Sequence, residues 1–246
     1  MNFNSNWWDM FLETTQNLSK TSVIKNTMDK TETENLRKNV LEVISELAKL
    51  RTNKYGYRVY VDGILLDYKE MNRIYDSPPT IYESIEEWSS RVFGESKFGI
   101  IINAGEKFSH SLSKNIALKT KPLLDKVGFP REGINFSIFI GNYDKTPLGI
   151  HKDPLGEDVM HFHLGPGDKT MYTWSKEEYE RLTTIEKYDR KETELFIPFA
   201  TEFAFKEGDM YFMPEGEYHI GKQAELSIAV TFWRYNHTKE KLAKKL

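Results

Sequence analysis

The chain has 246 residues, 39% of them hydrophobic and 29% charged, so it is long enough and apolar enough to bury a sizeable core. Lys and Arg number 34 against 37 Asp and Glu, and this balance provides no strong basic field for a nucleic-acid backbone or an anionic membrane. The absence of cysteine excludes disulfides, thiolate zinc sites, iron–sulfur clusters and a catalytic thiol, so any metal must bind to His and carboxylate ligands.

The first half of the chain is predicted to be mixed and mostly helical. Residues 7–12 carry apolar side chains with the spacing of a short helix that packs on the body of the protein. Apolar residues recur every three or four positions from Thr31 to Leu50, and the polar residues 31–34 are typical of a capped helix start. Further helices are expected over residues 81–93 and 112–127, and a strand over residues 57–61.

After Gly128 the pattern changes to short aromatic and β-branched runs separated by turn signals such as Gly165-Pro166-Gly167. The runs are residues 134–140, 159–164, 201–205, 210–213 and 226–233. Many short strands with tight turns predict an antiparallel barrel or sandwich. A charged stretch over residues 175–194 interrupts the strands and is predicted to be helical at its start.

Three residues form a candidate metal site. His151 and Asp153 are two positions apart, so on an extended segment both side chains point to the same face. His219 follows a predicted turn and precedes a predicted strand, from which it can approach the same point. Two imidazoles and one carboxylate with open opposite positions form the facial triad of non-haem Fe(II) oxygenases. A His-x-Asp pair alone is a weak signal, because a turn histidine bonded to a nearby carboxylate has the same spacing.

The residues around His219 are more specific. Gly208, Pro214, Gly216, His219 and Gln223 resemble, in type and spacing, the second metal-binding motif of the cupin superfamily. In physical terms, the glycines and the proline form turns on both sides of a strand, so that the histidine enters the mouth of a barrel.

Upstream segments narrow the resemblance. Residues 136–141, Thr146-Pro147 and then residues 148–153 resemble the iron-binding segment of Jumonji-C-type cupin hydroxylases, which use Fe(II) and 2-oxoglutarate. Residues 226–233 resemble their last core strand. The resemblance implies a mainly β fold with α elements: a double-stranded β-helix, the cupin or jelly-roll core, with an N-terminal helical cover. We therefore expect one domain over residues 1–246.

Within that domain, residues 1–127 are expected to form the mostly helical cover and residues 128–236 the barrel core. The resemblance also implies that His151, Asp153 and His219 bind the iron. In that family a lysine downstream of the His-x-Asp pair holds the distal carboxylate of 2-oxoglutarate, and Lys169 is the candidate here. The alternative is a solvated turn lysine.

Two further residues are candidates for contacts with an anionic cosubstrate. Thr231 matches a position where the family places a polar residue near 2-oxoglutarate, although an ordinary β-branched strand residue fits the pattern equally well. Arg234 is a weaker candidate, since an arginine after a strand is usually solvated.

A second metal site competes with the first. His161 and His163 share one strand face, and His-x-His is the first metal motif of ordinary cupins, so these residues and His219 could form a three-histidine site. That motif expects a glutamate four or five residues later, where this chain has Gly167 and Asp168. We therefore favour the site that contains Asp153.

The resemblance implies an enzyme, a non-haem Fe(II)- and 2-oxoglutarate-dependent dioxygenase that hydroxylates an unactivated C–H bond of a peptide, protein or amino acid-derived substrate. The alternatives are a three-histidine metalloenzyme or small-ligand-binding cupin that does not use 2-oxoglutarate, and a metal-free interaction domain. The family also suggests a homodimer. No apolar run approaches the roughly 20 residues of a membrane span, so we expect a cytoplasmic protein with neither a membrane nor a nucleic acid as partner.

Overall fold

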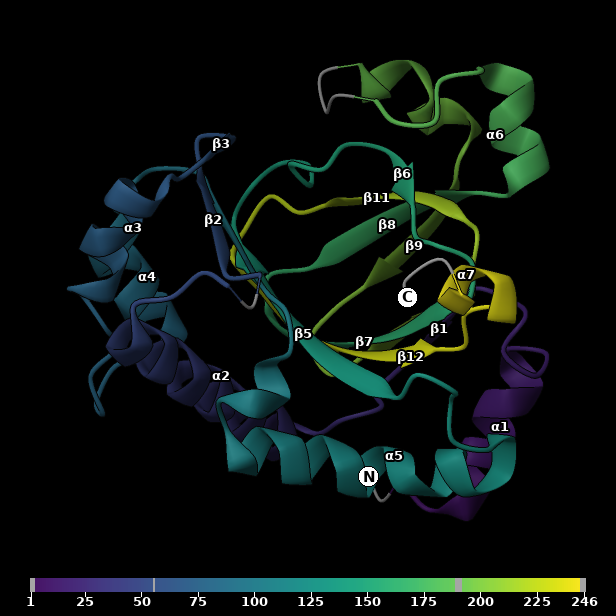
Figure 1. Ribbon diagram of the computed structural model, residues 1–246, viewed down its shortest axis with the longest axis horizontal. Coiled ribbons are helices and arrows are strands. Elements are labelled where there is room, and N and C mark those ends of the chain that lie inside the picture. Colours follow the sequence, from purple (N-terminus) through teal and green to yellow (C-terminus); the bar gives the residue numbers. More distant parts are fainter. Residues whose placement is uncertain (1–2, 55, 189–191, 244–246) are drawn as a thin grey trace.

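The computed structural model describes residues 3–54, 56–188 and 192–243, whose strands form two antiparallel sheets that face each other (Figure 1). Among the described strands the larger sheet contains, in spatial order, β1 (Ser22–Ile24), β10 (Met210–Met213), β7 (Glu157–Pro166), β12 (Ser227–Tyr235), β5 (Ile134–Gly141), β4 (Phe98–Ile102), β2 (Arg58–Val61) and β3 (Ile64–Leu65). The smaller sheet contains β6 (His151–Lys152), β11 (Tyr218–Lys222), β8 (Lys169–Trp174) and β9 (Thr201–Phe205). From β5 to β12 the chain passes repeatedly between the two sheets, as in a double-stranded β-helix.

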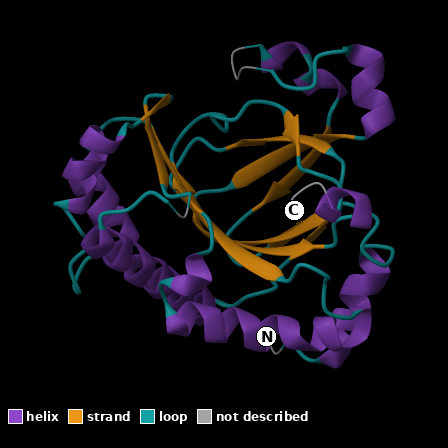
Figure 2. Cartoon of the chain, viewed as in Figure 1, coloured by secondary structure: helices purple, strands orange, loops and turns teal. Residues whose placement is uncertain are grey.

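Helices cover the outer face of the larger sheet. The smaller sheet is flanked mainly by loops and by one short helix, Lys176–Leu182 (Figure 2). In chain order the described helices are α1 (Ser5–Thr14), α2 (Lys30–Leu50), α3 (Tyr68–Tyr75), α4 (Ile85–Phe93), α5 (His110–Val127), α6 (Lys176–Leu182) and α7 (Lys239–Ala243). Short 3-10 turns lie at Gly105–Lys107, Thr193–Leu195 and Ile197–Phe199. The main core lies between α1, α2 and α5 and the larger sheet, where Phe162, Phe212 and Phe232 are fully buried.

The predicted helix over residues 31–50 is present, with a different start. Asp29 is its N-cap, and the Asp29 carboxylate accepts from the backbone N–H of Glu32 while the Glu32 side chain accepts from the N–H of Asp29. This reciprocal capping box fixes the first turn one residue earlier than the polar stretch from Thr31 predicts. Leu50 lies at the end of the buried stripe and is exposed.

The helix predicted from Ile81 begins only at Ile85. Ser84 caps it, with its hydroxyl accepting from the N–H of Glu87. Ile81 and Tyr82 lie before the cap and are both 89% exposed, so their apolar character is not part of the helix stripe. The N-cap at Ser84 therefore determines where the helix begins, although the apolar spacing predicted a start at Ile81.

Residues 1–127 supply four strands as well as the predicted helices, and the larger sheet runs across the predicted boundary at residue 127. β4 pairs with β5, and β1 pairs with β10, so the N-terminal strands extend the barrel sheet at both edges. Every residue of β4 is buried, which removes the alternation by which a strand is found in a sequence.

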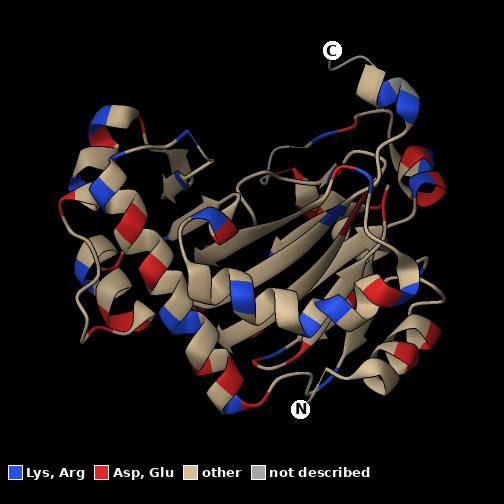
Figure 3. Cartoon of the chain, turned by 60° about the horizontal axis from the view of Figure 1, so that its bottom comes forward, with Lys and Arg blue, Asp and Glu red and all other residues tan. Residues whose placement is uncertain are grey.

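The charged stretch over residues 175–194 begins with α6, as predicted, and residues 189–191 of it lie outside the described residues. Lys, Arg, Asp and Glu are interspersed along the outer helices, while the strands are largely uncharged (Figure 3). None of the described helices combines the length and the apolar composition needed to cross a membrane.

Candidate functional site

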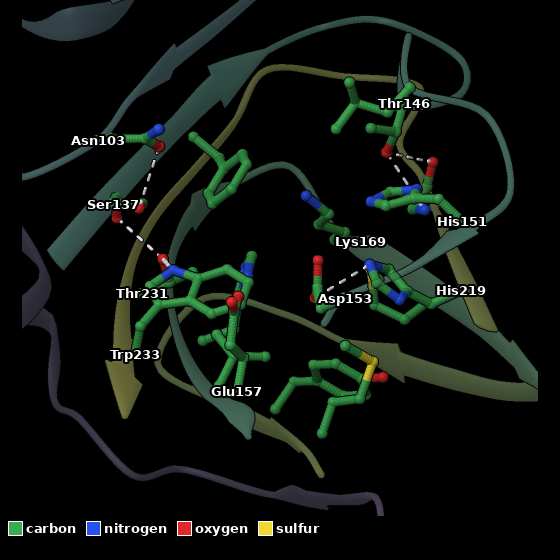
Figure 4. A pocket seen from close by; sticks show the side chains of 18 of the residues that line it. Asn103, Ser137, Thr146, His151, Asp153, Glu157, Lys169, His219, Thr231 and Trp233 are labelled. Carbon is green, nitrogen blue, oxygen red and sulfur yellow. Dashed lines mark hydrogen bonds and ion pairs between the residues drawn. The ribbon is translucent and has the colours of Figure 1, made fainter. Parts of the chain in front are cut away.

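A cavity of about 300 Å³ lies between the two sheets. Its walls come from both of them: β5, β7, β10 and β12 on one side, β8 and β11 on the other. This volume is at the lower end of the range of small-molecule sites. His151, Asp153, His219, Lys169 and Thr231 all line it, so the structure brings every residue of the predicted site to one place (Figure 4).

The three candidate metal ligands meet at the side of the cavity formed by the smaller sheet. His151 on β6 is the direct partner of His219 on β11, and their ring centroids are 4.4 Å apart. Asp153 follows β6, with its Oδ2 3.8 Å from the His219 Nε2. Ligand atoms of all three lie within 4.8 Å of one another, and no other group of three His, Asp or Glu side chains among the described residues meets this criterion.

Backbone carbonyls orient both imidazoles. The Nδ1 of His151 lies 2.9 Å from the Gly149 carbonyl oxygen, and the Nδ1 of His219 lies 3.2 Å from that of Glu217. In each case Nδ1–H donates to the carbonyl, which leaves the Nε2 lone pair for a ligand. This arrangement is usual for metal-binding histidines, whose second nitrogen is held by a neighbouring acceptor.

The charge state of the site fits a cation. Burial, and then the neighbouring His219, lower the pKa of His151 to about 4, so this imidazole is neutral at pH 7. Asp153 Oδ2 is buried and lacks a hydrogen-bond donor among the described residues. A buried carboxylate oxygen without a donor is costly, and a metal ion removes that cost. Two imidazoles and one carboxylate form a donor set that suits a divalent transition metal.

The predicted position of His219 needs one correction. It does not lie between a turn and a strand but is the second residue of β11 itself, paired on one side with β6 and on the other with β8. Gly208 and Gly216 do form turns, with φ of +84° and +81°. Gln223, the last residue of the cupin-like motif, is not among the residues that line the cavity, and its side-chain amide donates to the Gly141 carbonyl oxygen.

Lys169 lies on β8 with its side chain directed into the cavity (Figure 4). The residue is only 5% exposed, and burial lowers the pKa of its ammonium to about 8, so it stays largely protonated at pH 7. No carboxylate among the described residues forms an ion pair with it; its Nζ lies 5.9 Å from the Phe139 ring centroid. Gly221 makes room for it, since a Cβ there would stand 3.1 Å from the Lys169 Cε.

Thr231 faces the same cavity from β12. Its hydroxyl donates to the Ser137 carbonyl oxygen at 3.1 Å and accepts from the Trp233 Nε1 at 2.8 Å. The Ser137 hydroxyl in turn donates to the Asn103 side-chain oxygen at 3.3 Å. These bonds produce a polar row along the larger sheet, on the side of the cavity opposite His151 and His219 (Figure 4).

The alternative three-histidine site is not assembled. His163 is fully buried outside the cavity, with its Nε2 bonded to the Gly167 carbonyl oxygen at 2.8 Å. His161 does line the cavity, but it lies on β7 of the larger sheet, across from His219. Burial, with a smaller effect of Lys169, lowers the pKa of His161 well below its usual value. Arg234, the weaker anion candidate, lies outside the cavity lining and pairs with Asp158.

Several residues that line the cavity could not be predicted from the sequence. Tyr143 and Thr146 line the cavity, and the Tyr143 ring fits only because Gly99 and Gly141 have no side chain. The others include Arg58, Asn103, Asn135, Tyr211 and Glu157. Alternation along a strand indicates two faces but not which of them lines a cavity, and the partners of these residues are far away in the chain.

No family model and no curated protein matches the sequence. Solved structures do match, among them structures of YcfD from Escherichia coli, a ribosomal oxygenase. The X-ray structure of YcfD has 16% sequence identity and a TM-score of 0.54, and the match covers 96% of this chain and 55% of that one. The complex of YcfD with cobalt and succinic acid has 15% identity and a TM-score of 0.53, covering 96% and 53%. The complex with cobalt and 2-oxoglutarate has 16% identity and a TM-score of 0.52, covering 96% and 54%.

The fold is that of the ribosomal oxygenase structures. This likeness and the strand order confirm the predicted architecture, a jelly-roll β core with a helical cover. The protein studied here spans about half the length of YcfD. At this level of identity the likeness establishes the fold, while the activity has to be argued from the site.

Proposed function

We propose that the protein is an Fe(II)- and 2-oxoglutarate-dependent oxygenase that hydroxylates an unactivated C–H bond of a peptide, protein or amino acid-derived substrate. The observation that carries this proposal is the grouping of His151, Asp153 and His219 in one cavity with Lys169. A cavity that holds both a buried carboxylate oxygen without a hydrogen-bond donor and a buried ammonium group without a carboxylate partner among the described residues suits a cation and an anion as ligands.

The matched structures support the same ligands. YcfD has been solved with cobalt and 2-oxoglutarate, and with cobalt and succinic acid. The donor set of this chain fits such an ion, and its cavity fits a small dicarboxylate beside it.

Each residue has a distinct proposed role. His151, Asp153 and His219 would hold Fe(II) on one face, and the carbonyls of Gly149 and Glu217 keep the imidazoles in the tautomer that binds it. Lys169 would hold the distal carboxylate of 2-oxoglutarate through a charge-assisted hydrogen bond. Thr231 lines the opposite wall and would contact the cosubstrate from there.

When bound, Fe(II) and 2-oxoglutarate supply the oxidising chemistry: dioxygen provides one oxygen atom to the substrate C–H bond and the other to succinate, with release of carbon dioxide. The residues of this chain do little acid–base work. They position the cosubstrate and the C–H bond, and apolar walls such as Phe139, Val159 and Met213 keep water out of the reaction.

The proposal is tested by succinate formation. Purified protein with Fe(II), dioxygen and 2-oxoglutarate is expected to release succinate slowly even without a substrate, and NMR or mass spectrometry measures it. Asp153→Ala is expected to abolish the release, because one of three metal ligands is lost.

Asp168→Asn is the matched control, since Asp168 is an exposed carboxylate next to Lys169 and outside the cavity lining. It is expected to release succinate at the wild-type rate. No succinate from the wild type, or equal release by Asp153→Ala, contradicts the proposal.

A further inference from the structure

The cavity contains a second cation besides Lys169. Arg58 lies on β2, lines the cavity and is partly buried. Its guanidinium makes no hydrogen bond or ion pair with the described residues, and its Nε is buried without an acceptor. Buried arginines are normally paired; Arg37, for example, bridges Glu86 and Glu207. A buried donor of this kind lowers stability unless a ligand accepts from it.

Two amide groups accompany Arg58. The Asn135 side-chain oxygen accepts from the backbone N–H of Ala104 at 3.0 Å, and the Asn103 side-chain oxygen accepts from the Ser137 hydroxyl at 3.3 Å. With both oxygens directed to the protein, both Nδ2 groups remain as donors, and neither has an acceptor among the described residues. Three donor groups without acceptors therefore line one part of the cavity.

The sheet register explains why these donors are neighbours. Arg58 pairs with Ile101 across β2 and β4, and Asn103 follows Ile101 by two residues, so both side chains are on the same face. Asn103 contacts Ser137 on β5, and Asn135 precedes Ser137 by two residues on that strand. The three donors thus lie along a diagonal across three neighbouring strands, with Asn103 between Arg58 and Asn135.

This group is distinct from Lys169 and from the metal ligands, and Asn103 continues the polar row that contains Thr231. Lys169 is on the smaller sheet and Arg58 on the larger one, and Figure 4 shows Asn103 on the side away from His151 and His219. The cavity is lined by two carboxylates, Asp153 and Glu157. Asp153 belongs to the metal site, and the Glu157 carboxylate accepts from the His237 Nε2 at 2.7 Å. Neither of them forms an ion pair with Arg58.

We propose that Arg58, Asn103 and Asn135 bind a carboxylate of the substrate that is oxidised. A guanidinium fork matches a carboxylate with two parallel hydrogen bonds, and the amide donors add selectivity for an anion. Because the cavity of about 300 Å³ also has to hold 2-oxoglutarate, the part of the substrate inside it is amino acid-sized. The inference rests on the proposed function, which assigns Lys169 to the cosubstrate.

Binding of carboxylate probes tests this inference without turnover. The full chain is saturated with Mn(II) and N-oxalylglycine, an unreactive analogue of 2-oxoglutarate, and titrated with N-acetylated amino acids in isothermal calorimetry or NMR. The affinity of each acid is compared with that of its C-terminal amide, which tests whether the site binds an α-carboxylate. N-acetyl-aspartate amide and N-acetyl-glutamate amide, compared with their asparagine and glutamine counterparts, test a side-chain carboxylate.

At least one acid is expected to bind about tenfold or more tightly than its neutral counterpart, because the charge-assisted bonds are lost in the neutral compound. Arg58→Gln is expected to remove that difference. Arg58→Lys is expected to retain part of it, since the charge stays while the fork is lost. The matched control is Arg73→Gln, an exposed arginine in the last turn of α3, which is expected to bind as the wild type does.

Three results would overturn the inference: no acid binds more tightly than its neutral counterpart, Arg58→Gln discriminates as the wild type does, or Arg58→Gln loses N-oxalylglycine instead. The last result would assign Arg58 to the cosubstrate. Succinate release without substrate is measured on the wild type and on Arg73→Gln, and the inference expects equal release by both. A wild type that releases no succinate contradicts the oxygenase function, whereas the probe titration reports on Arg58 alone.

Discussion

The two sheets of the barrel differ in what they contribute. The larger sheet packs a continuous apolar face against α1, α2 and α5, and this contact contains most of the buried aromatic and aliphatic residues. The smaller sheet has a much smaller apolar cluster around Trp174 and Tyr218, yet it presents His151, His219 and Lys169 to the cavity. The residues that stabilise the fold and the residues proposed to bind metal are therefore concentrated in different layers, and substitutions should separate the two properties.

The largest expected effect on stability is in the larger sheet. Phe212 on β10 is fully buried, with its ring centroid 5.6 Å from that of Phe11 on α1. Phe212→Ala is expected to lower the free energy of unfolding by about 3–5 kcal/mol, because it leaves a cavity at the centre of the core. Urea unfolding measures it, with Phe199→Ala, an exposed site, as the control expected to change stability by less than about 0.5 kcal/mol.

The folded fraction of Phe212→Ala is expected to bind Co(II) with the wild-type affinity. Loss of metal affinity in the folded protein would show that the two sheets are coupled, and would contradict the assignment of stability to one sheet and metal binding to the other.

In the smaller sheet the expected effect is on binding. Lys169→Ala is expected to raise the KM for 2-oxoglutarate by about 100-fold, or about 2.7 kcal/mol, because a buried charge-assisted contact is removed. Stability is expected to stay the same or increase, since the variant removes a buried ammonium without a protein partner. Succinate release at varied 2-oxoglutarate concentrations measures the KM.

Lys222→Ala, at an exposed position on β11, is the control for a lost lysine and is expected to keep the wild-type KM. An unchanged KM in Lys169→Ala would instead support the interpretation of Lys169 as a structural residue.

A smaller effect concerns pH. Burial lowers the pKa of His163 on β7 to about 4, below the value of about 6.5 in the unfolded chain. Because the unfolded chain takes up this proton at a higher pH, stability falls as pH falls from about 6.5 to 4. From pH 7 to pH 5 this histidine alone accounts for about 2 kcal/mol.

His163→Gln is expected to reduce the loss of unfolding free energy between pH 7 and pH 5 by about 2 kcal/mol in urea titrations. His110→Gln, at an exposed position, is the control for the loss of a histidine side chain. Equal pH dependence in the wild type and in His163→Gln would show that His163 is not held in its neutral form by burial.

The smallest expected effect is at the edge of the helical layer. Ser84→Ala removes the N-cap of α4 and is expected to lower stability by about 1 kcal/mol. Ser90→Ala lies exposed inside the same helix, where alanine is favourable, and is expected to change stability by no more than about 0.5 kcal/mol. A Ser84→Ala protein as stable as the wild type would show that the packing of α4, and not its cap, fixes its start.

The residues that form turns made much of the fold predictable from the sequence. Gly208 and Gly216 have positive φ, and the strands between such turns were predicted close to their observed bounds. The run Phe98–Ile102 was missed because it is buried on both faces and does not alternate. Four other strands, β1, β3, β6 and β8, were not among the predicted runs: the first three have only two or three residues, too few to show alternation, and β8 follows directly on the predicted turn at Gly165-Pro166-Gly167.

The candidate site likewise contains residues that could be predicted from the sequence and residues that could not. His151 and Asp153 could be predicted from local spacing, and His219 from a resemblance that includes its turns. Arg58 and Asn135 come together only through pairings of β2, β4 and β5, which no short window of sequence contains. That these side chains are donors without acceptors can be recognised only from the hydrogen bonds in the structure.

Cobalt binding to three forms of the protein tests the central claim most directly. Titration with Co(II), followed by its visible absorption, is expected to show one ion per wild-type chain. His161→Ala is expected to keep this affinity, and Asp153→Ala to lose more than about 100-fold, because even groups that only orient metal ligands contribute about 10–100-fold. Tight binding by Asp153→Ala together with weak binding by His161→Ala would contradict the account and favour a three-histidine site.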